Sequence, residues 1–184
     1  MTRTFAPTPV DTALLDDLLD TARWAPSAGF AQGAHLIMLT GPRVDDFWRV
    51  TGAEHWYAEG VRAAPVVVLA LADPTAYTER YAAPDKAGHG LEDPAAWPVP
   101  YWLTDTAMAV QNLLLLLEAH GLGALWFGVF RNADVLLADL GVPGHLQLVG
   151  VAAIGFRAGD DRPSGSATHR PRRGRSEQIH HEHW

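Results

Sequence analysis

Four arginines lie close together near the end of the chain, in the stretch SATHRPRRGR (166–175). A guanidinium group keeps its charge at physiological pH and pairs well with phosphate oxygens, so this stretch predicts an anion-binding segment. The chain as a whole has a formal net charge of −7. Long-range attraction to a polyanion follows the summed charge, so one small phosphate is favoured over nucleic acid or a membrane surface. A solvated arginine cluster without a ligand is the alternative.

The final residues HHEHW offer three imidazoles, but they do not predict a metal site. His181 and His183 would share one face of a strand, and no second cluster in the sequence completes a tetrahedral set. The chain has no cysteine, which excludes disulfides, thiolate ligands and thiol nucleophiles. We therefore expect no bound metal and no covalent catalysis by a thiol.

Familiar nucleotide-binding loops and membrane signals are absent from the sequence. Neither a G-x-G-x-x-G loop nor a Walker-type loop occurs, so a bound phosphate needs another cradle. The N-terminal stretch MTRTFAPTPV lacks the apolar core of a signal peptide. The longest apolar run, 113–117, is far shorter than the ~20 residues that cross a bilayer. We expect a soluble cytoplasmic protein.

Hydrophobic periodicity predicts helices interleaved with strands. The stretch 11–25 places leucines on one face and aspartates on the other, with Asp11 as a plausible N-cap. The stretch 104–123 is apolar almost all round and predicts a helix buried in the core or at a subunit interface. Short apolar runs predict strands, and further helices are expected between 44 and 63 and between 132 and 141; the predicted strands are 35–40, 64–72, 124–130 and 146–156.

Two segments do not fit this core. Residues 73–102 are rich in proline and aromatics without a clear period, which is typical of a lid or binding loop. Residues 157–184 are polar and arginine-rich and predict a C-terminal arm. Mobile surface is the alternative for both. No linker or internal repeat divides residues 1–184, so we expect a single domain.

Three stretches together resemble the nitroreductase family of flavin enzymes. ARWAPSAGFAQ (22–32) is similar to the family's A-P-S-x-x-N-x-Q signature, with Phe30 where the family often has asparagine. DTAMAVQNLLLLLEAHGLGALWFGVF (105–130) is similar to its long helix and the strand that follows. The tail HRPRRGRSEQIHHEHW resembles the family's K/R-x-R followed by a short apolar strand.

The resemblance implies an α+β sandwich with a central, mostly antiparallel sheet flanked by helices. It also implies a homodimer in which the C-terminal arm crosses to the partner, and FMN bound in the seam between the two copies. Trp184 would then pack against the partner subunit.

The same resemblance suggests which residues would hold FMN. Arg3, Arg170 and Arg172 would bind its phosphate. The first arginine and the serine of the family's N-terminal R-x-S-x-R would fall at or before Met1; either translation begins upstream, or fewer groups hold that phosphate here. The other candidate cofactor-binding residues lie in the two remaining motifs: Ser27, Ala28, Gln32, Phe127, Gly128 and Val129. A main-chain N–H of the segment 127–129 would bond the flavin nitrogen N5, which favours hydride acceptance.

The function implied is an oxidoreductase that passes electrons from NAD(P)H through FMN to a flat, electron-poor acceptor by a ping-pong mechanism. Because the cofactor carries the chemistry, we expect no catalytic side chain. Trp97, Tyr101 and Trp102 are candidates for the walls of the acceptor site, or else they pack within the lid. Two alternatives stay open: a flavin-binding protein with little turnover, and a flavin enzyme with another donor such as reduced F420.

Overall fold

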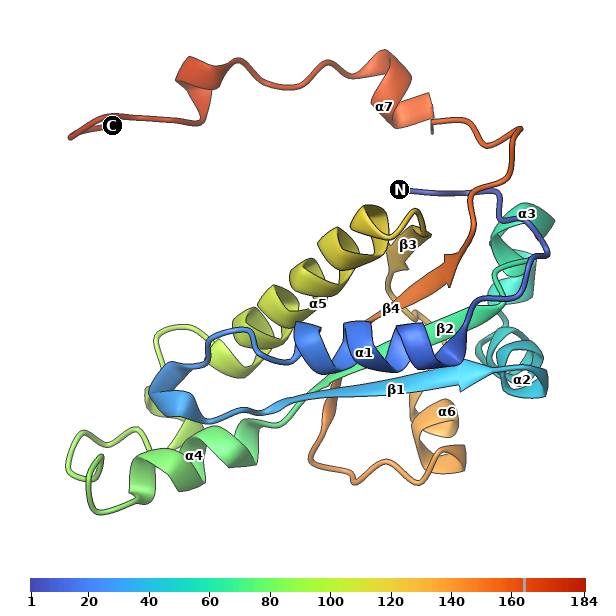
Figure 1. The fold of residues 1–184 in the computed structure, drawn as a ribbon. Coiled ribbons are helices and arrows are strands. Elements are labelled where there is room, and N and C mark those ends of the chain that lie inside the picture. The colour runs from blue at the N-terminus through green and yellow to red at the C-terminus, as the bar shows by residue number, and fades with distance from the viewer. Residues whose placement is uncertain (164) are drawn as a thin grey trace.

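Four strands form one antiparallel sheet in the computed structural model, which describes residues 1–163 and 165–184 apart from the Ala167 side chain (Figure 1). The strands are β1 (Ala34–Thr40), β2 (Val66–Ala72), β3 (Gly123–Phe127) and β4 (Gln147–Gly155), and their order across the sheet is β1-β2-β4-β3. Each neighbouring pair runs antiparallel. The expected α+β fold with an antiparallel sheet is confirmed.

Helices α1 (Thr12–Ala22) and α5 (Tyr101–Ala119) pack on one face of the sheet. The Asp11 carboxylate accepts a hydrogen bond from Ala13 N at 2.9 Å, so the predicted N-cap of α1 is confirmed. Leu15 and Leu18 of α1 and Leu113 of α5 are buried against this face, as the leucine spacing predicts.

The opposite face is covered by α2 (Pro42–Thr51), α3 (Glu59–Arg62) and α6 (Ala133–Asp139). Successive residues of β2 point to opposite faces, so Val67 joins this second cluster while Val66 and Val68 join the first. Every residue of β2 is buried, which explains why its sequence is an unbroken apolar run.

The segment 73–102 is more ordered than its sequence indicates. It contains helix α4 (Pro74–Ala82), whose first N–H groups are capped by Asp73 through bonds from Thr75 N at 2.8 Å and Ala76 N at 3.2 Å. The prediction of an irregular segment is therefore wrong for this part, because a side-chain cap and a proline in the first turn start a helix that has little periodicity. Only one 3-10 turn, Pro94–Ala96, interrupts the remaining stretch before α5.

Within the single chain, helix α5 is buried on one side, and the predicted burial of its other side at a subunit interface stays a prediction. Met108 and Leu115 are 40% and 61% exposed on its other side. Beyond β4 the chain leaves the body as an arm with a short helix α7 (Gly165–His169) and a 3-10 turn, Arg175–Glu177. Figure 1 shows the C-terminus standing apart from the sheet.

Candidate functional site

The loop after α1 has an unusual backbone. Gly29, Phe30 and Gln32 all have positive φ, at 60°, 61° and 56°. Only glycine adopts this region without cost, and residues held there elsewhere mark sites where the surroundings impose the shape. A Cβ at Gly29 would lie 2.8 Å from the Tyr81 ring, so glycine is also needed for close packing.

A buried carboxylate holds this loop. Asp105 of α5 is 5% exposed, and its Oδ2 accepts hydrogen bonds from Ala28 N and from the Tyr77 hydroxyl, each at 2.8 Å. Burial, and then the bond to Asp105, raise the pKa of Tyr77 well above its usual value, so the phenol stays protonated and donates. Asp105 therefore joins the loop to both α5 and α4.

Further bonds fix the remaining turns of the loop. Arg80 Nε of α4 donates to the Gly29 carbonyl at 2.8 Å, and its Nη1 donates to Asp85 at 2.8 Å. The hydrogen bond from Arg80 lowers the pKa of Asp85 to about 2, so this carboxylate is ionised at neutral pH. Ser27 Oγ accepts from Gln32 N at 3.0 Å and closes the loop on itself.

Two of the predicted loop residues line a small pocket. Ser27 and Gln32 border a cavity of about 90 Å³ together with Tyr77 and Asp105. The N–H of Ala28 is occupied by Asp105. The sequence analysis missed Asp105; the available signal was a carboxylate within a stretch that is otherwise apolar almost all round.

The segment at the end of β3 lines a larger cavity. Phe127, Gly128 and Val129 border a space of about 420 Å³. Its other walls come from the end of α2 with the turn after it and from the segment before α6. The first group is Thr51, Ala53, Trp56 and Tyr57, and the second is Phe130 and Arg131. Such a wall, aromatic with one cation, suits a flat ring. Nothing in the spacing of Trp56 and Tyr57 indicated this role.

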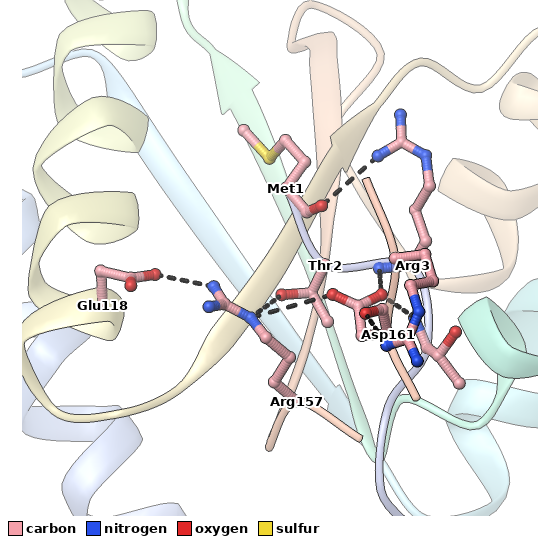
Figure 2. Close-up of polar contacts among 8 residues, drawn as sticks. Met1, Thr2, Arg3, Glu118, Arg157 and Asp161 are labelled. Carbon is pink, nitrogen blue, oxygen red and sulfur yellow. Dashed lines mark hydrogen bonds and ion pairs between the residues drawn. The ribbon is translucent and has the colours of Figure 1, made fainter. Parts of the chain in front are cut away.

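The chain's N-terminal segment is joined to the root of the arm, as Figure 2 shows. Asp161 Oδ1 accepts from Arg3 N at 2.8 Å and from Thr4 N at 2.9 Å. Arg157 Nε donates to Thr2 Oγ1 at 3.1 Å, and its Nη2 donates to Glu118 at 3.0 Å. We call Thr2–Thr4, Arg157 and Asp161 the N-terminal clasp. The Arg3 guanidinium projects from it, with a long 3.4 Å contact to the Met1 carbonyl.

Comparison with known proteins identifies the family. A scan against models of protein families matches residues 1–156 to the Nitroreductase family, which is the whole chain up to the arm. The chain belongs to the nitroreductase family. The predicted family and its assignment as an oxidoreductase are thereby confirmed.

Curated relatives match most of this chain. An NADH dehydrogenase of Thermus thermophilus is 29% identical over 183 residues, with 88% of this chain and 84% of that protein covered. A protein named as an NADH dehydrogenase/NAD(P)H nitroreductase from Archaeoglobus fulgidus is 24% identical, with 85% of this chain and 83% of that protein covered.

Solved structures share the fold of this chain at low sequence identity. A nitroreductase-like protein of Streptococcus mutans has a TM-score of 0.73 at 16% identity, covering 97% of this chain and 91% of that one. A protein described as a nitroreductase from Desulfovibrio desulfuricans, in complex with FMN, has a TM-score of 0.69 at 24% identity, covering 100% and 91%.

The aromatic residues of the segment 73–102 form a cluster of their own, which includes Tyr81. The Trp97 ring lies 4.8 Å from Tyr81, 5.6 Å from Tyr101 and 6.2 Å from Trp102, measured between centroids. Trp102 is buried and its Nε1 donates to Gln147 at 3.2 Å, whereas Tyr101 is 39% exposed at the margin.

The arm places its arginines away from the two pockets described above. Arg170 and Arg172 are exposed. Among the described residues, the hydrogen bonds made by 165–184 have both partners inside the arm. Trp184 is 96% exposed and stacks on His180 with the ring centroids 4.3 Å apart. Among the described residues no group of three or more His, Asp or Glu side chains is arranged to hold a metal. None of the described helices has the length and apolar character needed to cross a bilayer.

Proposed function

We propose that this member of the nitroreductase family is an FMN-dependent oxidoreductase that passes electrons from NAD(P)H to a small, flat, electron-poor acceptor such as a nitroaromatic or a quinone. The observation that carries the proposal is the loop 27–32, which has three residues at positive φ and is held by the buried Asp105. It coincides with the family's flavin motif. The names of the curated relatives, which include NADH and NAD(P)H, support the choice of donor.

The residues present fit an FMN group. A terminal phosphate needs cations; Arg170 and Arg172 are exposed, and Arg3 is half-buried with its guanidinium projecting from the clasp. A flat ring needs an apolar wall and a close main chain, and the cavity at 127–131 offers both. Gly128 has no side chain there, and a Cβ would lie 3.3 Å from the Phe130 ring.

Each segment would have a distinct task. Ser27, Ala28 and Gln32 would hold the ribityl and ring portions, while an N–H of Phe127, Gly128 or Val129 would donate to the flavin nitrogen N5. When bound, FMN would supply the hydride chemistry, so the chain's own part is to bind, orient and exclude water. Donor and acceptor would use one ring face in turn, which is a ping-pong cycle.

We further propose a homodimer with FMN in the seam. Loop 27–32 and segment 127–129 line separate pockets of one chain, so a second copy would bring both to one cofactor. The arm exposes Ile179 and Trp184, and α5 exposes Met108 and Leu115. Apolar side chains on an arm and on one helix face are the surfaces that a swapped dimer would bury.

The absorbance spectrum of the purified chain tests this function. We expect flavin bands, or their appearance on adding FMN, and bleaching by NADH or NADPH under anaerobic conditions. If only reduced F420 bleaches the flavin bands, the electron donor is reduced F420 and not NAD(P)H. If FMN binds tightly but turnover is negligible, the chain is a flavin-binding protein. A colourless chain that ignores added FMN would contradict the proposal.

A further inference from the structure

We propose that Asp161 is a positioning residue that sets the preference for a flavin bearing a terminal phosphate over one without it. It would act through the main chain that carries Arg3 and through the root of the arm that carries Arg170 and Arg172. This inference rests on the proposed function, since it concerns how the chain would hold the phosphate of FMN.

The Asp161 carboxylate lies at a junction of two segments remote in sequence. Its side chain is 11% exposed, and one oxygen accepts both the Arg3 and the Thr4 N–H groups (Figure 2). Its other oxygen is 3.9 Å from Arg157 Nε. Hydrogen bonds to an ionised acceptor are the stronger kind, so Asp161 fixes the direction of the main chain at residue 3.

The strand-like pairing around it reinforces this direction. Ala158 N donates to the Thr4 carbonyl at 2.9 Å, and Ala6 N donates to the Phe156 carbonyl at 2.8 Å. Thr2 is fully buried, with its N–H bonded to Ala124 at 2.9 Å. Arg3 thus stands between two fixed neighbours while its guanidinium remains available to an anion.

The same carboxylate lies where the arm leaves the body. Residues up to 158 pair with the N-terminal segment, and from residue 162 onward the described residues of the arm are exposed. Arg170 and Arg172 are farther along this arm. Loss of the Asp161 bonds would loosen the main chain that carries Arg3 and the root from which the arm with Arg170 and Arg172 extends.

An effect through charge and an effect through main-chain position predict opposite changes in FMN affinity for Asp161→Asn. A carboxylate near a phosphate repels it, so removing the charge would tighten FMN binding if charge were the main effect. If Asp161 acts by position, the weaker neutral acceptor loosens the clasp and FMN binds less well. The sign of the change therefore separates the two.

The experiment titrates the full-length, flavin-free chain with FMN and with riboflavin, which differ only in the phosphate. We expect D161N to raise the Kd for FMN about tenfold, in line with the loss of a charge-assisted bond, and to leave the Kd for riboflavin within about twofold. Glu118→Gln is the matched control, because Glu118 is exposed and contacts Arg157 at the outer side. It should change neither Kd.

Several outcomes would overturn the inference. An unchanged ratio of the Kd for FMN to the Kd for riboflavin would do so, whether both Kd values rise by the same factor or neither changes. A lower Kd for FMN would also do so. If D161N does not fold, Asp161→Glu keeps the charge and displaces it by one methylene, and the same loss of FMN preference is expected. A wild-type chain that binds neither flavin overturns the proposed function and this inference with it; normal wild-type binding with an unchanged ratio overturns this inference alone.

Discussion

Two carboxylates shape the candidate site in the same chemical way but in different surroundings. Asp105 accepts the Ala28 N–H, and Asp161 accepts those of Arg3 and Thr4. Asp105 is 5% exposed and lies beside a packed aromatic cluster, whereas Asp161 lies at the start of an exposed arm. In both places main-chain direction is set by a side chain far away in sequence.

The difference lies in what surrounds the bonds. Around Asp105 a failed bond leaves buried groups without water, so the loop 27–32 should keep its shape before any ligand arrives. The Asp161 side chain is also largely buried, at 11% exposed, but the arm that follows it is exposed, so we expect the clasp to fix a direction while adding less to stability. The following substitutions test that contrast, beginning with the largest expected effect.

Asp105→Ala should be the most damaging. It leaves the Ala28 N–H and the Tyr77 hydroxyl unpaired in a buried site, and each such group costs about 1–3 kcal/mol. We expect the free energy of unfolding to fall by roughly 3 kcal/mol in denaturant titrations. Affinities for FMN and riboflavin should fall by the same factor, in contrast to Asp161→Asn.

The control for this substitution is Thr106→Val in the same helix. Thr106 is fully buried, and its hydroxyl bonds to the Trp102 carbonyl within α5. We expect it to change stability without a specific effect on either flavin. Loss of FMN affinity alone in Asp105→Ala would contradict the assignment of this residue to the loop.

Gly33→Ala should have an intermediate effect. A Cβ there would lie 2.7 Å from the Tyr77 ring and 2.9 Å from the Asp73 carbonyl oxygen, so main chain must move. Overpacking of this kind costs about 1–3 kcal/mol. The comparable Gly60→Ala beside the clasp should cost less, because its Cβ would lie 3.0 Å from the Thr4 methyl and 3.2 Å from the Arg3 carbonyl oxygen, both longer than the two shortest contacts at Gly33.

Melting temperatures of the two alanine variants check this prediction. Gly144→Ala serves as the neutral control, because a Cβ at that position meets nothing within 4 Å. If Gly60→Ala proved as damaging as Gly33→Ala, the clasp would be as rigid as the loop and the contrast would fail.

Asp85→Asn should have the smallest effect, visible as a change in acid sensitivity. Arg80 lowers the pKa of Asp85 to about 2, below its ordinary value near 4. A lowered pKa stabilises the folded state above the ordinary value, and this contribution is lost as the pH falls towards 2. The melting temperature of Asp85→Asn should therefore lie slightly below wild type at pH 6 and meet it near pH 2. Parallel curves would show that the exposed pair contributes nothing.

Much of the scaffold could be predicted from the sequence, because it depends on neighbours along the chain. The Asp11 cap, the leucine face of α1 and the apolar run of β2 are local patterns, and each appears in the structure. Helix α4 was missed because its start is set by one capping side chain and not by periodicity. Ser27 and Gly128, which the family motifs single out, border cavities in the structure, and their role in binding FMN stays a prediction.

What tertiary structure alone decided is how those motifs are held. The Asp105 and Ala28 partners are 77 residues apart in sequence, and Asp161 and Arg3 are 158 apart. No local pattern encodes such pairs. In the sequence each of these aspartates looks like any other polar residue, because only packing places an N–H group beside its carboxylate. The sequence determined the elements and the motifs by local propensity and hydrophobic spacing. The burial that makes two carboxylates into supports of a site arises only when the sheet, α5 and the chain's two ends come together.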